Sequence, residues 1–289
     1  MKNNLFLFSC LFLIGFSASA QYSEDYVEVY STNIGGENYS IVKMSRKDER
    51  VKIKYFSGKD FTGRSVYERY SAWAKNKNII ALSSGAYMTH CDASYATPIG
   101  LCIDNGQLVN NEIANFDGLA IVYTTGEMAF SNLKDGDLGV TKGDGTKMTL
   151  NLNNSFDRTR FIKWAEDNAA TVFQTHLLYF DGKPKVYTNG SQLIRDRQLI
   201  ITGKDRSGEI FHFIVHLKGG ATLYDATFKA AKFLQVNEDL TIKSIINVDP
   251  GCHHILEVRK SDGSIDGQSG FTGKNPISSA LNLIVFYYE

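Results

Sequence analysis

Residues 210–249, IFHFIVHLKGGATLYDATFKAAKFLQVNEDLTIKSIINVD, contain a strand, a helix and a second strand in succession. Apolar residues dominate the runs 210–215 and 244–249, which is typical of buried strands. Between these runs, the Thr222 hydroxyl can cap the free N–H groups that open a helix, and Asp225 occupies the acidic position of a capping box. The predicted helix turns one apolar stripe toward the core, formed by Leu223, Ala226, Ala230 and Phe233.

Short apolar runs of the same kind recur along the rest of the chain, separated by turns that contain glycine. The runs 39–44 and 51–55 predict a hairpin whose turn is the charged segment 46–49. Apolar residues at helical spacing predict two further helices, over 64–75 and 157–168. A few helices among many short strands predict an α+β fold: a single domain with a mixed, largely antiparallel β-sheet core and a few flanking helices.

The N-terminus has the pattern of a secretory signal peptide. Lys2 precedes an apolar run over 5–16 that is too short to span a bilayer, and small residues at 18 and 20 suit signal peptidase. Cys10 lies inside the apolar run and not after it, which argues against a lipoprotein. We therefore predict a signal peptide over 1–20, cleaved near Ala20–Gln21, a mature domain over 21–289, and a secreted or periplasmic location. No later run predicts a transmembrane segment.

The charge balance excludes some partners. The chain has 31 basic and 31 acidic residues, so it lacks the basic field that nucleic acid or an anionic membrane surface would attract. The mature cysteines are Cys91, Cys102 and Cys252, an odd number that allows at most one internal disulfide. Cys91 and Cys102 can close a small loop if their geometry permits.

Three stretches occur in a characteristic order. The first is IALSSGAYM at 80–88 followed by PIGL at 98–101, the second is RQLI at 197–200, and the third is GATL at 220–223 followed by INVDPGCH at 246–253. In this order and spacing they resemble the phosphodiester glycosidase family. That family has a strand ending in Asn-Gly-Gly-Phe-Phe, an arginine at the start of a strand, a Gly-Met-Thr-Leu helix and a closing Asn-Leu-Asp-Gly-Gly-x-Ser strand and loop. The resemblance extends from about residue 39 to the C-terminus.

The resemblance implies an exported hydrolase that cleaves a sugar-1-phosphodiester bond in a glycan or envelope polymer. Arginine suits phosphate because its planar fork donates paired hydrogen bonds, and a carboxylate beside the anomeric carbon can act as nucleophile, base or electrostatic partner. Arg197 and Asp249 match these catalytic roles, with His253 as a third catalytic candidate. Residues matched to substrate binding are Ser84, Gly85, Tyr87 and Gly251.

Other interpretations of these residues remain open on sequence alone. Asp249 can be a turn aspartate that accepts hydrogen bonds from its own loop. Arg197 can form a surface ion pair with Asp196, and Arg195 competes for the phosphate role. Gly85 allows close backbone approach, and the ring of Tyr87 suits either the core or a wall against which a sugar stacks.

Four positions depart from the family pattern: Ser84 replaces asparagine, Ala86 and Pro250 replace glycines, and His253 replaces serine. Proline removes a backbone N–H donor, whereas a protonated His253 imidazole could donate to a phosphate oxygen in its place. His254, the next residue, points to the opposite face of an extended chain. The departures also support an alternative: a non-catalytic glycan-binding or envelope-associated protein on the same fold.

No metal or cofactor is predicted. His212 and His216 are four residues apart in a strand, so they share a face, but two imidazoles without a third ligand do not make a zinc site. Asp135-Gly136-Asp137 hints at a calcium loop, but the third acidic ligand is missing and Gly139 is misplaced, so we interpret the segment as a polar turn.

Overall fold

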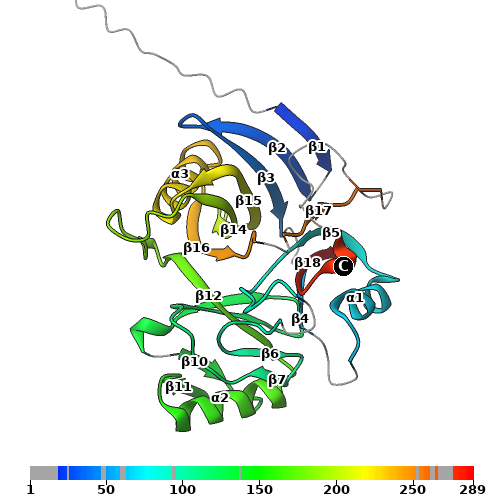
Figure 1. Ribbon diagram of the computed structural model, residues 1–289, viewed down its shortest axis with the longest axis vertical. Helices are drawn as coiled ribbons and strands as arrows, with labels where there is room; N and C mark the ends of the chain where they lie inside the picture. The colour runs from blue at the N-terminus through cyan, green and yellow to red at the C-terminus, as the bar shows by residue number, and fades with distance from the viewer. Residues whose placement is uncertain are drawn as a thin grey trace, which may run out of the picture.

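A computed structural model describes residues 19–24, 26–46, 50–58, 63–92, 96–136, 138–251, 254–260, 264–265 and 276–289. The predicted α+β fold is confirmed: across these residues, three α-helices flank β-sheets in which all strand pairs are antiparallel (Figure 1). The first strand, β1 (Ser19–Glu24), spans the predicted cleavage point, and most of the predicted signal peptide lies outside the described residues. Within them, no helix is both long and apolar enough to cross a membrane.

The largest sheet runs through the middle of the molecule. Its strands lie in the order β1, β2 (Val27–Ile34), β3 (Glu37–Ser45), β15 (Ile210–Ala221), β14 (Arg195–Lys204), β16 (Thr241–Val248), β12 (Thr171–Phe180), β6 (Cys102–Asp104) and β7 (Gln107–Asn110). Three further strands attach around β12, namely β13 (Lys183–Pro184), β8 (Gly118–Val122) and, beside β8, β9 (Met128–Asn132).

Two smaller sheets complete the β-structure. One has four strands in the order β17 (Leu256–Val258), β5 (Asn78–Ser83), β18 (Asn282–Tyr288) and β4 (Val51–Ser57), and the other is the hairpin of β10 (Leu138–Thr141) and β11 (Lys147–Leu150). Short 3₁₀ turns cover Leu133–Asp135 and Ile277–Ser279.

The predicted hairpin of residues 39–44 and 51–55 is wrong. Strand β3 pairs with β2 on one edge and β15 on the other, so neither edge is left for β4. Strand β4 instead pairs with β18 from the end of the chain. The charged segment between them therefore connects two sheets and does not close a hairpin.

All three predicted helices form, and each begins at a polar capping residue. Ser65 caps α1 (Val66–Ala74) in a full capping box, Asn154 caps α2 (Ser155–Asp167), and Thr222 caps α3 (Leu223–Asn237). The Thr222 side chain accepts a hydrogen bond from the Asp225 N–H, as the sequence predicts. Such side-chain oxygens satisfy donors that have no partner within the helix.

The core is layered. Helix α3 packs on one face of the large sheet, over residues such as Leu199 and Phe213. The other face packs against the four-stranded sheet, where Ile214 and Ile246 meet Ile284. Helix α1 covers the far side of the four-stranded sheet, and α2 closes a separate core with β8 and the β10–β11 hairpin. The large sheet is therefore buried on both faces around its central strands.

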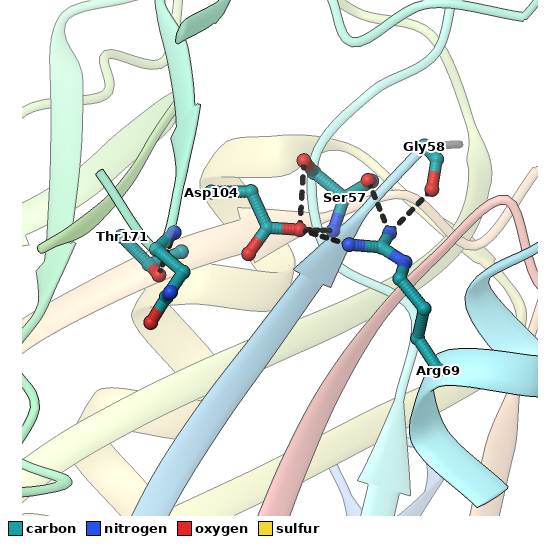
Figure 2. A network of polar contacts seen from close by, with 6 residues as sticks. Ser57, Gly58, Arg69, Asp104 and Thr171 are labelled. Atoms are coloured by element: carbon teal, nitrogen blue, oxygen red, sulfur yellow. Dashed lines mark hydrogen bonds and ion pairs between the residues drawn. The ribbon is translucent and has the colours of Figure 1, made fainter. Parts of the chain in front are cut away.

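A buried polar network fixes α1 to the sheets (Figure 2). Arg69 of α1 donates from Nη1 to Asp104 Oδ2 at 2.7 Å and from Nη2 to the carbonyl oxygens of Ser57 and Gly58. The Ser57 N–H also donates to Asp104 Oδ2, at 3.0 Å. One carboxylate at the end of β6 thus ties together β4 and α1.

The cysteine pair that the sequence allows does not form. Cys102 is a free thiol buried in β6, and burial raises its pKa to about 12. Cys91 is disulfide-bonded, so its partner lies outside the described residues. The 91–102 pairing is therefore excluded, and Cys102 packs within the hydrophobic core.

Candidate functional site

Two predicted residues, Arg197 and Asp249, lie at the ends of adjacent central strands. In the β14–β16 ladder, Gln198 lies opposite Val248. Continuing this antiparallel register by one residue places Arg197 opposite Asp249. Directly opposed residues of an antiparallel pair project from the same face. Arg197 and Asp249 are therefore expected on the same face of the sheet, the face on which α3 packs, at the ends of their strands.

Asp249 is the first residue of the loop after β16, and hydrogen bonds to its side chain and to its backbone hold it in place. Its Oδ1 accepts a hydrogen bond from the Gly251 N–H at 2.8 Å, the geometry of a turn aspartate. Its N–H donates to the Gly85 carbonyl at 3.0 Å, and its own carbonyl accepts from the Ser84 hydroxyl at 2.8 Å. The first and third family-like stretches therefore contact each other directly at Asp249.

Gly85 does allow close approach, but the approaching groups belong to the protein itself. A Cβ at this position would lie 2.6 Å from Tyr55 Cε2 and 2.9 Å from Asn282 Oδ1. The Gly85 N–H donates to Asn282 Oδ1 at 2.7 Å. Asn282 also donates to the carbonyl of Ala86, which is fully buried. The Gly85 N–H is therefore already bonded within the protein, and the role of Gly85 in substrate binding stays a prediction.

Arg197 is buried, with 6% of its surface exposed, whereas Arg195 is exposed. Its Nε donates to the Ala221 carbonyl at 2.9 Å, and its Nη2 donates to the Leu193 carbonyl at 2.6 Å. In the described part of the chain no carboxylate lies within ion-pair distance of Arg197, so the surface-pair interpretation with Asp196 is wrong. Burial lowers the pKa of Arg197, although the nearby Tyr87 hydroxyl opposes this shift. The two carbonyls fix a desolvated guanidinium in one orientation.

Tyr87 belongs to a group of three half-buried rings beside this pair. Its ring centroid lies 5.4 Å from that of Phe116 and 5.5 Å from that of His176, which itself lies 4.5 Å from Phe116. The Tyr87 hydroxyl is hydrogen-bonded to the Asn247 side chain. Burial raises the pKa of Tyr87, and Asp249 raises it further while Arg197 lowers it. Tyr87 therefore lies within electrostatic range of both predicted catalytic residues.

His176 is a residue that the sequence analysis missed. It lies on β12 directly opposite Asn247 of β16, and hence on the same face as the site. Burial lowers its pKa, while Asp117, which is ion-paired with Lys134 at 2.9 Å, opposes that shift. No sequence motif surrounds His176, and only the pairing of β12 with β16 places it beside Asn247 and Tyr87.

His254 lies on the other face of the large sheet. Its Nε2 is 2.6 Å from Gln198 Oε1, and its ring stacks on His216 with centroids 4.6 Å apart. The Gln198 amide nitrogen donates to Ser83 Oγ at 2.7 Å. This buried network supports the strands beneath the site. His253 and Cys252 lie outside the described residues, so the catalytic prediction for His253 stays a prediction.

His212 and His216 share one face of β15, as predicted, and both are buried. Within the described residues, no three His, Cys, Asp or Glu side chains are arranged to hold a metal ion. Burial, with a smaller contribution from Arg46, lowers the pKa of His212 to about 3. Its Nδ1 lies 3.1 Å from the Thr202 hydroxyl.

This low pKa predicts a loss of stability in mild acid. As pH falls below about 6.5, the unfolded chain binds a proton at His212 that the folded chain does not bind until about pH 3. The free energy of unfolding should therefore fall by about 1.4 kcal/mol per pH unit, or ~2 kcal/mol between pH 6.5 and 5. Urea unfolding at pH 7 and 5 should show His212→Asn losing ~2 kcal/mol less than wild type. The exposed His90→Asn variant is the control, and equal losses in all three proteins would contradict the prediction.

Comparisons with known proteins define the fold only. No protein-family model matches the sequence, and no curated protein matches it. Over 94% of its length the chain is similar to a hypothetical protein from Synechocystis, with a TM-score of 0.51 and 10% identity, and it spans 64% of that protein, less than two thirds. It is also similar, over 95% of its length and 82% of the other chain, to the zebrafish N-acetylglucosamine-1-phosphodiester alpha-N-acetylglucosaminidase catalytic domain auto-inhibited by pro-peptide. That comparison has a TM-score of 0.48 and 14% identity, and it indicates nothing about activity.

Proposed function

We propose that this protein is an exported hydrolase that cleaves a sugar-1-phosphodiester bond in a glycan or envelope polymer. The observation that carries the proposal is the placement of Arg197 and Asp249, which come from two separate family-like stretches, flank the paired residues Gln198 and Val248 of neighbouring strands, and both act on the pKa of Tyr87. A buried guanidinium without a carboxylate partner in the described chain favours an anionic ligand, because the ligand would compensate a desolvated charge. A phosphodiester supplies such an anion.

Each residue then has a defined task. Arg197 holds a phosphate oxygen, with its orientation set in advance by the Ala221 and Leu193 carbonyls. Asp249 places negative charge beside the anomeric carbon as the bond to the phosphate oxygen breaks and an oxocarbenium-like centre develops. Water then adds to that carbon, and the phosphate leaves as the monoester of the remaining alcohol. The rings of Tyr87 and His176 form a wall on which the sugar can pack.

The test is sugar release from an N-acetylglucosamine-1-phosphodiester, with UDP-N-acetylglucosamine as a surrogate. Wild type should release sugar, and Arg197→Ala should lower kcat/KM about a hundredfold because a charge-assisted bond to phosphate is lost. Arg195→Ala is the matched control, since that arginine is exposed and should change kcat/KM much less. Equal activity in wild type and Arg197→Ala would remove Arg197 from the mechanism. Thermal melts of the three proteins separate lost chemistry from lost folding.

A second function, non-catalytic glycan binding on the same fold, is favoured by one observation. The Gly85 N–H is engaged by Asn282, and Pro250 has no N–H, so two backbone positions near Asp249 offer no donor to a phosphate. This alternative predicts saccharide binding without sugar release over long incubation. Turnover that depends on Asp249 would exclude it.

A further inference from the structure

A hollow lies beside α3, and none of its lining residues belongs to the candidate site. It is a groove of about 400 Å³ between α3 and the end of the β12–β13 ribbon. Its walls include Tyr179, Pro184 and Val186 on the ribbon side and Tyr224, Phe228 and Lys232 on the helix side. The volume lies within the range of small-molecule binding pockets, which are mostly apolar with a few polar groups.

The helix side of the groove presents aromatic surface to solvent. Phe228 is 52% exposed, and its ring is parallel to that of Tyr224, with centroids 5.8 Å apart and an interplanar angle of 6°. These residues are one helical turn apart, so their rings project from the same side of α3. The exposed side chains of Lys232 and Gln235 add hydrogen-bond donors at the rim. Flat apolar faces bordered by donors are complementary to a pyranose ring, whose own faces are apolar and whose edge carries hydroxyl groups.

A single segment, residues 185–194, links the groove to the candidate site. At one end Val186 lines the groove, and the Lys185 N–H is bonded to the Leu178 carbonyl of β12. At the other end the Leu193 carbonyl holds Arg197. Exposed apolar side chains lie along this segment, namely Tyr187, Leu193 and Ile194. A chain-like ligand that reached Arg197 could therefore continue along this segment into the groove.

We propose that the groove between α3 and the β12–β13 ribbon is a saccharide-binding subsite. It would hold sugar residues of the glycan some distance from the bond that is cut. The role as an extension of the catalytic site rests on the proposed function, whereas saccharide binding in the groove does not. The proposal makes a polymeric glycan the substrate, and not a free sugar phosphodiester.

The test is isothermal titration calorimetry of the full chain with soluble hexasaccharides of N-acetylglucosamine, glucose and mannose. At least one hexasaccharide should bind wild type. Phe228→Ala should weaken that binding about tenfold through loss of aromatic contact, and Phe228→Tyr should retain it. Val236→Ala is the control on the same helix, because Val236 is 70% exposed and lies outside the groove.

The proposal is overturned if no hexasaccharide binds, if Phe228→Ala binds as well as wild type, or if Val236→Ala weakens binding equally. Hydrolysis of UDP-N-acetylglucosamine serves as the separate readout. Val236→Ala should leave it unchanged, because that side chain lies outside the groove. If wild type lacks hydrolase activity altogether, the proposed function fails while the calorimetry still decides the groove.

Discussion

Asp249→Asn should lower kcat for sugar-phosphodiester hydrolysis on the order of a thousandfold while leaving the fold intact. The substitution is close to isosteric, and the asparagine oxygen can still accept the hydrogen bond that Asp249 Oδ1 receives from the Gly251 N–H. The backbone bonds of residue 249 to Gly85 and Ser84 do not involve its side chain and are also retained. The change therefore removes the negative charge while these bonds are kept, and a loss of rate reports on that charge.

Asp205 provides the matched control for this experiment. It too is a turn aspartate whose Oδ1 accepts bonds from its own loop, from the Glu209 N–H at 2.9 Å and the Ser207 hydroxyl at 2.7 Å. It lies at the far end of the β14–β15 hairpin, away from Arg197. Asp205→Asn should keep full activity. If Asp249→Asn is equally active in the sugar-release assay, Asp249 is a turn residue only.

Local structure was predictable from the sequence where local chemistry determines it. Thr222 caps α3 as its position before an apolar stripe predicts, because the bond it makes is to a residue three positions away. The hairpin predicted for residues 39–55 failed for the opposite reason. Strand β4 pairs with β18, more than two hundred residues away, and nothing local indicates that partner. Periodicity identifies a strand but not its neighbour.

The residues of the candidate site also fall into two groups: those that a sequence motif indicates and those that only the fold brings together. Arg197 and Asp249 were found because each belongs to a motif in a recognisable order. His176 and Phe116 are the other two rings of the group that contains Tyr87, but they belong to no motif, and only the register of β12 against β16 places His176 beside Asn247. The burial of Arg197 could not be predicted from the sequence either, because its hydrogen-bond partners are backbone carbonyls, which every sequence supplies.

The second large effect concerns stability. Arg69→Met should lower the free energy of unfolding by about 3–5 kcal/mol, because it leaves the Asp104 carboxylate buried without its cation. The side chains of Arg69 and Asp104 are 12% and 8% exposed, and the carbonyls of Ser57 and Gly58 also lose a donor (Figure 2). Urea unfolding followed by tryptophan fluorescence measures the change.

The control for that experiment is an arginine–aspartate pair of similar geometry at the surface. Arg206 Nε lies 2.7 Å from Asp239 Oδ2, but the two side chains are 85% and 61% exposed, so Arg206→Met should cost less than about 1 kcal/mol. Adding Asp104→Asn to Arg69→Met should recover part of the lost stability, since the neutral amide oxygen can still accept from the Ser57 N–H without leaving an uncompensated charge. A double variant less stable than Arg69→Met would show that the carboxylate is stabilised by its other contacts and not by the arginine. Equal costs for Arg69→Met and Arg206→Met would mean that burial adds nothing to the pair that fixes α1 to the sheets.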